Sequence, residues 1–216
     1  MATRTTETTI PAGEVELSAD IVLPESVDGV VLFAHGSGSS RYSPRNRAVA
    51  GTLNEHALAT VLVDLLTPDE ERIDERTAEL RFDIDLLSNR LVGIVDWLRT
   101  GAELPVLPIG LFGASTGAAA ALSAAAARPD DVPAVVSRGG RPDLAGADLP
   151  EVRAATLLLV GERDEEVLGL NDVARRALGG EAVLHVVPGA THLFEEPGAL
   201  ERVADEAALW FGDHLG

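Results

Sequence analysis

The segment from residue 106 to residue 127 constrains the fold of this chain most. Its first part, Val106 to Phe112, has the length and composition of a buried β-strand. Gly113-Ala114-Ser115-Thr116-Gly117 follows, and an alanine-rich run over 118–127 then predicts a helix. The two glycines suit a turn so tight that a Cβ at either position would collide with neighbouring backbone. We therefore predict a strand, a sharp turn and a helix, with the Ser115 hydroxyl presented where the strand ends.

Short apolar runs alternate with helical patterns along the rest of the chain. This alternation predicts an α/β fold with a mostly parallel sheet and helices on both faces. We expect a hairpin or two short strands within 14–23, and a charged, solvated loop over 69–79. The further strands are expected at 30–34, 60–63, 134–136, 156–160 and 182–187, and the further helices at 44–58, 80–99, 167–178 and 197–215.

The length and composition predict one domain over residues 1–216. Hydrophobic residues make up 46% of the chain but aromatic residues only 4%, so alanine, valine and leucine must fill the core. No run approaches the ~20 apolar residues of a membrane span, and the first residues lack the apolar segment of a signal peptide. Cysteine is absent, which excludes disulfides and thiolate metal sites. These features predict a cytoplasmic protein without a membrane partner.

Acidic residues outnumber basic ones by 35 to 17, which gives a net charge of −18. Every one of the basic residues is arginine. Such a charge repels phosphate backbones, so we expect no nucleic-acid partner. A GC-rich genome and adaptation to high salt are two explanations for the missing lysine. The size of the charge favours the second, because salt screens the self-repulsion of an acidic surface.

Three polar side chains follow predicted strands in the order Ser115, Asp164, His192. A serine hydroxyl becomes a good nucleophile only when a base takes its proton and an acid orients that base. Because the carboxyl ends of parallel strands meet at one edge of a sheet, these three side chains can assemble there. We therefore predict Ser115 as nucleophile, His192 as base and Asp164 as acid. Three glutamates are alternatives to the acid: Glu162, Glu165 and Glu166.

Four other histidines compete with His192 for the role of base. His56 falls within a predicted helix, His185 within a predicted strand, and His214 two residues from the end. His35 follows a strand but adjoins a loop rich in glycine and serine, where it is better suited to shape that loop. His192 therefore remains the predicted base.

Acyl transfer also needs N–H donors aimed at the oxygen on which negative charge develops. The Thr116 N–H is one candidate, because it follows the nucleophile and is the first N–H of the predicted helix. The loop Gly36-Ser37-Gly38 offers the second candidate, the Ser37 N–H. We predict that these two groups form the oxyanion hole.

Taken together, these motifs resemble the α/β-hydrolase superfamily over essentially the whole chain. Within it, the segments 33–41, 113–117 and 189–194 resemble dienelactone hydrolase-like proteins. True dienelactone hydrolases use a cysteine nucleophile, whereas this chain has Ser115. The resemblance therefore implies a serine esterase that hydrolyses small soluble esters or lactones through an acyl-enzyme, with no cofactor.

Two features bear on the substrate. Only about a dozen residues separate the strand near Ser137 from Glu151, too few for a helical cap domain, so the site should be open. Four arginines also fall in loops at the predicted catalytic edge, in a chain that is otherwise acidic. Arg41 and Arg138 in particular could bind a substrate carboxylate, unless these arginines pair with nearby acidic residues instead. The full set is Arg41, Arg45, Arg138 and Arg141.

Other functions use the same residues. Thioester hydrolysis, or acyl transfer to an acceptor other than water, would need the same nucleophile and base. A binding module of the same fold would retain its ligand with little turnover. We expect no metal site, because the carboxylate groups at 69–71 and 83–85 fit solvated faces and no histidine cluster accompanies them.

Overall fold

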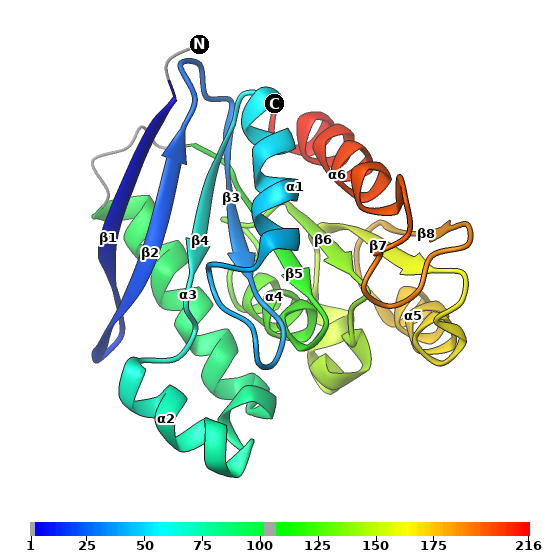
Figure 1. Ribbon diagram of the computed structural model, residues 1–216, viewed down its shortest axis with the longest axis horizontal. Coiled ribbons are helices and arrows are strands. Elements are labelled where there is room, and N and C mark those ends of the chain that lie inside the picture. Colours follow the sequence, from blue (N-terminus) through cyan, green and yellow to red (C-terminus); the bar gives the residue numbers. More distant parts are fainter. Residues whose placement is uncertain (1–2, 102–106) are drawn as a thin grey trace.

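The computed structural model describes residues 3–101 and 107–216, which form an eight-stranded sheet with helices on both faces (Figure 1). The strand order is β1-β2-β4-β3-β5-β6-β7-β8. β1 and β2 pair antiparallel, as do β2 and β4, and all the other neighbours are parallel. The strands are β1 (Arg4–Ala12), β2 (Val15–Leu23), β3 (Gly29–Ala34), β4 (Leu58–Val63), β5 (Ile109–Ala114), β6 (Ala134–Arg138), β7 (Ala155–Gly161) and β8 (Ala182–Val187). The predicted fold class is confirmed.

The helices form two layers, one on each face of the sheet (Figure 1). α1 and α6 pack together on one face, while α3 and α4 pack together on the other, with α5 beside them. The helices are α1 (Pro44–Glu55), α2 (Pro68–Thr77), α3 (Ile84–Thr100), α4 (Thr116–Ala127), α5 (Glu165–Ala177) and α6 (Ala199–Leu215), with 3-10 segments η1 (Leu80–Phe82) and η2 (Pro142–Glu151).

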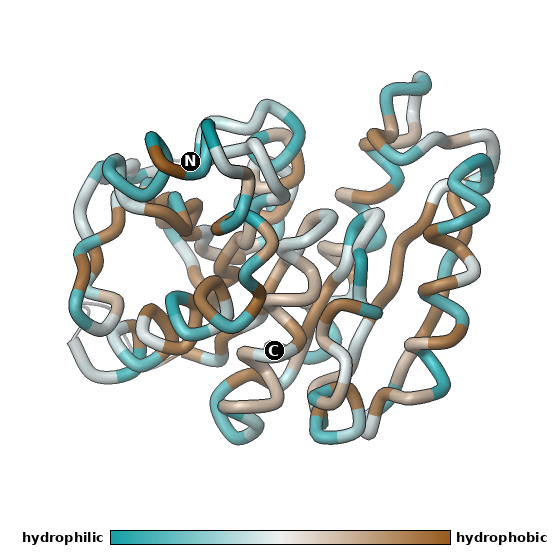
Figure 2. Tube along the Cα trace, turned by 90° about the horizontal axis from the view of Figure 1, so that it is seen from below, coloured by the Kyte–Doolittle hydropathy of each residue, from teal (hydrophilic) through white to brown (hydrophobic). Residues whose placement is uncertain are grey.

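Side-chain alternation along the central strands gives the protein two hydrophobic cores. In β3, Val31 and Phe33 pack in the core beneath α1 and α6, while Leu32 and Ala34 pack in the core beneath α3 and α4. Hydrophobic residues accordingly gather along the strands (Figure 2). Small alanines of α4 are fully buried, so this helix lies close to the sheet. Both faces of the central sheet are therefore covered, as parallel sheets require.

The charged segment 69–79 is not a loop, as we had predicted, but the helix α2. Thr67 accepts a hydrogen bond from the Glu70 N–H, and the Glu70 side chain accepts one from the Thr67 N–H. This capping box and the acidic first turn stabilise a helix that has almost no apolar face. The long helix expected over 80–99 also starts later, because Asp83 caps α3.

The N-terminal region differs from the prediction as well. β2 is one continuous strand over most of the segment 14–23, and its partner is β1, a largely exposed strand that we had not predicted. The elbow strand β5 begins at Ile109, and the expected first residue, Val106, lies outside the described residues. Only the short segment η2 fills the connection from β6 to β7, where a cap domain was excluded. Within the described ranges no helix has the length and apolar character needed to cross a membrane.

Candidate active site

Ser115 occupies the sharp turn between β5 and α4 with φ 52° and ψ −122°. This backbone conformation is rare for a residue with a side chain, and such residues cluster at functional sites. The two flanking glycines make the turn possible. A Cβ on Gly113 would lie 2.4 Å from Ala118 Cα, and one on Gly117 would lie 2.3 Å from Ala34 O. The turn therefore holds Ser115 at the carboxyl edge of the sheet.

Two backbone hydrogen bonds fix the position of Ser115. Its N–H donates to Arg138 O over 3.2 Å, and its carbonyl oxygen accepts from the Arg141 N–H over 3.0 Å. Arg138 is the last residue of β6, and Arg141 lies in the segment that follows it. The strained turn is thus anchored to the next strand of the sheet.

His192 and Asp164 lie 28 residues apart in sequence but in direct contact. His192 Nδ1 is 2.6 Å from Asp164 Oδ2, and the Asp164 side chain is only 15% exposed. Because the carboxylate accepts a hydrogen bond from Nδ1–H, Nε2 of the same ring is left as a proton acceptor. None of the three predicted alternatives, Glu162, Glu165 and Glu166, bonds to His192 within the described chain.

The imidazole of His192 lies beside the Ser115 turn. A Cβ on Gly139 would be 3.5 Å from His192 Cε1, and Gly139 directly follows Arg138, whose carbonyl holds the Ser115 N–H. Ser115 and His192 are not hydrogen-bonded to one another here. Catalytic hydrogen bonds are often long or poorly aligned until substrate binds, so their absence does not argue against the pair.

The other histidines have different partners. His56 Nδ1 bonds to Thr52 O within its helix, His185 contacts Glu206, and His214 Nδ1 bonds to Trp210 O. His56 follows α1, His185 lies in β8 and His214 lies in α6, and none of the three is hydrogen-bonded to Ser115, Asp164 or His192.

His35 lies on the loop 35–39, which we call the oxyanion loop after its predicted role. Both of its ring nitrogens have hydrogen-bond partners. Nδ1–H donates to Gly36 O over 3.0 Å, and Nε2 accepts from the Leu65 N–H over 3.1 Å. Burial lowers the pKa of His35, so the ring is neutral with its proton on Nδ1. His35 thus ties the loop 35–39 to the end of β4, in agreement with its predicted role.

Sequence reasoning missed two carboxylates that hold the loop before His192. Glu162 accepts from the Gly189 N–H over 2.7 Å, and Glu196 accepts from the Thr191 N–H over 3.1 Å. The bond from Thr191 lowers the pKa of Glu196. Neither residue belongs to a motif, so only the folded loop identifies them.

Ser37, which we predicted as the second oxyanion donor, has a partner for its N–H within the protein. Its N–H donates to Thr116 Oγ1 over 3.0 Å and is therefore already engaged in this structure. The loop itself lies where we expected, because a Cβ on Gly36 would be 3.1 Å from Ser115 Cβ. The Thr116 N–H stands at the start of α4, where the helix dipole favours negative charge. The Thr116 hydroxyl thus links the loop 35–39 to the first residue of α4.

No protein-family model matches the chain. A crystal structure described as a dienelactone hydrolase from Anabaena variabilis is 54% identical to it, with a TM-score of 0.97 and coverage of 99% of both chains. The chain belongs to the dienelactone hydrolase-like α/β-hydrolases. A Pyrococcus furiosus esterase structure shares the fold at 17% identity, with a TM-score of 0.77 over 99% of this chain and 92% of its own. The chain therefore has the α/β-hydrolase fold over its whole length.

Two Mycobacterium tuberculosis proteins, from different strains, are 55% identical over 212 residues and are named as candidate phosphoribosyl transferases. The match covers 98% of this chain but 47% of each relative. This dienelactone hydrolase-like chain thus spans about half the length of the curated relatives it matches.

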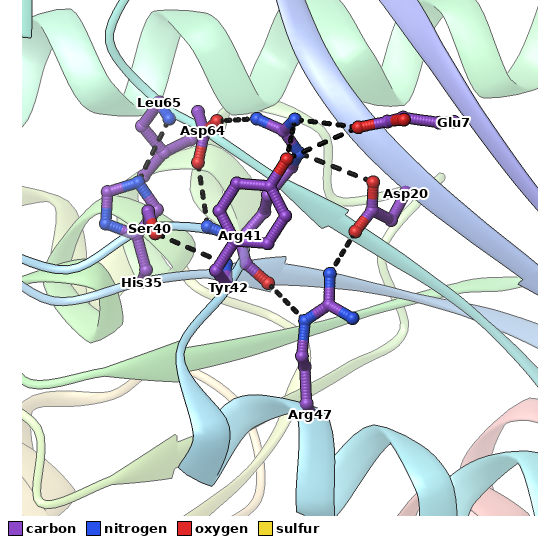
Figure 3. A network of polar contacts seen from close by, with 9 residues as sticks. All are labelled: Glu7, Asp20, His35, Ser40, Arg41, Tyr42, Arg47, Asp64 and Leu65. Carbon is purple, nitrogen blue, oxygen red and sulfur yellow. Dashed lines mark hydrogen bonds and ion pairs between the residues drawn. The ribbon is translucent and has the colours of Figure 1, made fainter.

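We predicted that Arg41 either binds a substrate carboxylate or pairs with nearby acidic residues, and in this structure it pairs with acidic residues (Figure 3). Its guanidinium contacts three carboxylates, with Nε 3.3 Å from Asp20 and Nη2 3.0 Å from Glu7. Nη1 contacts Asp64, and the backbone N–H of Arg41 donates to the same carboxylate over 2.7 Å. The Tyr42 ring stacks over the guanidinium at 4.2 Å. Arg41 therefore links the segment after loop 35–39 to β2 and to the end of β4, and most of its side-chain N–H donors already have acceptors within the protein.

The remaining arginines of this dienelactone hydrolase-like protein differ from one another. Arg141 forms two hydrogen bonds to Asp143, at 2.8 and 2.7 Å, and is likewise engaged. Arg45 contacts the exposed Glu195 over 3.4 Å. Arg138 is buried and forms no ion pair with any described residue.

A cavity of about 300 Å³ opens beside the oxyanion loop. One side is formed by residues 35–39 and Thr116, and the other by side chains of α2 and η1. Those side chains include Glu71, Asp74 and Arg81. In the described part of the chain, no group of three or more histidine and carboxylate side chains is arranged to hold a metal ion.

Proposed function

We propose that this chain is a serine hydrolase of small soluble carboxylic esters or lactones, with Ser115 as nucleophile, His192 as base and Asp164 as acid. One observation carries the proposal. A strained serine at a strand-to-helix turn adjoins a histidine whose Nδ1 lies 2.6 Å from a half-buried carboxylate. This combination is expected of a nucleophile that is activated by an oriented base.

The reaction follows from the hydrogen-bond pattern. Asp164 accepts from Nδ1–H, so His192 Nε2 can take the proton as Ser115 Oγ attacks the carbonyl carbon. The tetrahedral intermediate collapses, the alcohol leaves with the proton from Nε2, and an ester to Ser115 remains. Water then attacks this acyl-enzyme with the same base, releasing the acid and restoring the hydroxyl.

The developing oxyanion would be stabilised at the start of α4. The Thr116 N–H is one donor, and the helix dipole adds to it. The Ser37 N–H would be the second donor once the carbonyl oxygen of the substrate shares or replaces its bond to Thr116 Oγ1. The Thr116 N–H is held in place by the start of α4, whereas the Ser37 N–H has to exchange its partner when the substrate binds.

The surroundings of the site favour a small substrate. The connection η2 is short and the adjoining cavity measures about 300 Å³. Pockets for drug-sized ligands begin at about that volume. We therefore propose esters with short acyl chains, hydrolysed without activation by a lipid surface.

The name given to the Mycobacterium relatives describes proteins of roughly twice this length. We assign the hydrolase chemistry to the half that this chain shares with them. We assign any phosphoribosyl transfer to the part of those proteins that lies outside the match. Supporting this assignment is the oriented histidine beside the strained serine, which a transferase of that kind would not need.

The test is a panel of p-nitrophenyl esters of rising acyl length, with one lactone and one thioester, assayed with the wild type and with Ser115→Ala. We expect kcat/KM to peak at short chains and to fall by several orders of magnitude in the variant. A preference for the thioester would show that the enzyme is a thioester hydrolase rather than an esterase. Equal activity of Ser115→Ala and the wild type would overturn it.

A further inference from the structure

Arg138, the last residue of β6, is a buried cation that has no counter-ion among the described residues. Its side chain is 9% exposed, and Nη2 donates to Asn46 Oδ1 over 3.3 Å. Nη1 is buried and has no hydrogen-bond partner among the described residues. Burial and the neighbouring Arg45 lower the pKa of Arg138 to about 10, so it remains charged at neutral pH. Buried charges in folded proteins are ordinarily paired, and this one is not.

Arg45 contributes a second buried donor in the same place. Its Nε is buried without a partner in the part of the chain that the structure describes, and its one ion pair is the 3.4 Å contact with Glu195. Arg45 directly precedes Asn46, the residue that binds Arg138. The positive charge of Arg45 is close enough to Arg138 to help lower the pKa of Arg138.

The start of α1 adds to the positive field. Ser43 caps this helix, Pro44 is its first residue, and its first turn carries no acidic side chain. The partial positive charge of the helix end is therefore not neutralised locally. α1 begins at the edge of the sheet where β3 and β5 have their carboxyl ends (Figure 1). The Ser115 turn lies at the same edge.

We propose that Arg45 and Arg138 form a binding site for a small oxyanion, either a carboxylate or a phosphate group. Two planar guanidinium groups with free N–H donors suit such groups, because oxygen anions accept paired hydrogen bonds from arginine. The site adjoins the catalytic centre, since the backbone of Arg138 holds the Ser115 N–H. The bound group could be a free anion or the acidic group of a substrate. Only the second case rests on the proposed function.

Calorimetry with the Ser115→Ala chain tests the site independently of turnover. Sodium acetate and sodium phosphate are titrated separately at constant ionic strength into Ser115→Ala, and into the same chain carrying Arg138→Met or Arg45→Met. We expect saturable binding of at least one anion, weakened tenfold or more by either methionine, which keeps the length of the apolar stem. Arg176→Met is the matched control, because it removes an exposed arginine at the far end of α5, and it should bind like the parent.

Melting temperatures give a second test, because Arg138→Met and its parent should respond differently to the anion. Without the anion, Arg138→Met should melt above its parent because it removes an unpaired buried charge. The anion should then raise the melting temperature of the parent and leave that of the variant unchanged. The proposal is overturned if neither anion binds saturably, or if Arg138→Met and Arg45→Met both bind as tightly as the parent.

A matched pair of esters separates the two sources of the anion. The 4-nitrophenyl ester of succinic acid carries a free carboxylate, and its methyl ester is neutral. If the substrate supplies the anion, the wild type should favour the acidic ester at least tenfold in KM, acetate should compete with it, and Arg138→Met should abolish the preference. If the two esters have equal KM values and acetate does not compete with either, the site binds a free anion. Failure to hydrolyse either ester would remove the proposed function and leave the calorimetric result intact.

Discussion

Thr116 brings two polar groups to the same point beside Ser115. Its N–H begins α4, and its hydroxyl accepts the Ser37 N–H over 3.0 Å. Thr116→Val would leave the Ser37 N–H unpaired and the oxyanion loop less firmly held. We expect kcat/KM to fall about tenfold, less than the ~100-fold or more for losing a direct oxyanion donor. Thr116→Ser keeps the acceptor and should retain most activity in the same ester assay. Equal values for both variants would show that the hydroxyl has no part in positioning the loop.

His35 makes the stability of the protein depend on pH. Burial lowers its pKa in the folded state below the ordinary value of 6.5, so below that pH the unfolded chain binds more protons. The stabilisation that comes from burying neutral His35 should therefore be complete above pH 6.5. The free energy of unfolding should fall as the pH drops below that value. Urea unfolding between pH 8 and pH 5 measures this loss. His35→Gln should show a smaller loss over that range, whereas an identical slope in both proteins would contradict the account.

At the scale of elements, the strand-turn-helix β5–α4 depends on space that only glycine leaves. A Cβ on Gly117 would lie 2.3 Å from Ala34 O and 2.5 Å from His35 O. Gly117→Ala should therefore destabilise the protein by about 1–3 kcal/mol, as overpacking does, and lower kcat. Gly169→Ala is the control, because nothing lies within 4 Å of its Cβ position in α5. It should stabilise by about 0.5–1 kcal/mol, as alanine does in a helix interior. Equal effects of the two substitutions on urea unfolding would refute this packing argument.

Elements with a strong local signal were predictable, and tertiary partners were not. Apolar runs between turn residues gave the central strands, because buried parallel strands need hydrophobic side chains on both faces. α2 was missed because its residues have no apolar period, although the pair Thr67 and Glu70 was the available capping signal. Long arginine side chains can reach many partners. Sequence therefore could not distinguish Arg41, which contacts three carboxylates, from Arg138, which contacts none in the described part of the chain.

For the molecule as a whole, the net charge of −18 should govern its response to salt. Even if each of the 17 arginines neutralised one of the 35 acidic residues, the unpaired carboxylates would still repel one another. A Debye length of about 3 Å at 1 M salt removes most of that repulsion. The melting temperature should therefore rise steeply from dilute buffer to molar KCl, and activity should persist there. A composition set by codon usage alone predicts a flat response beyond the first few tenths molar, and a melting temperature that falls toward molar salt contradicts adaptation to salt.

The central claim is that Ser115 attacks the substrate with His192 as its base. The most direct measurement is mass spectrometry of the protein after reaction with a fluorophosphonate, followed by peptide mapping. The account predicts one covalent adduct, located on Ser115, with labelling slowed by orders of magnitude in His192→Ala and absent in Ser115→Ala. An adduct on another residue, or full labelling of Ser115→Ala, would contradict it.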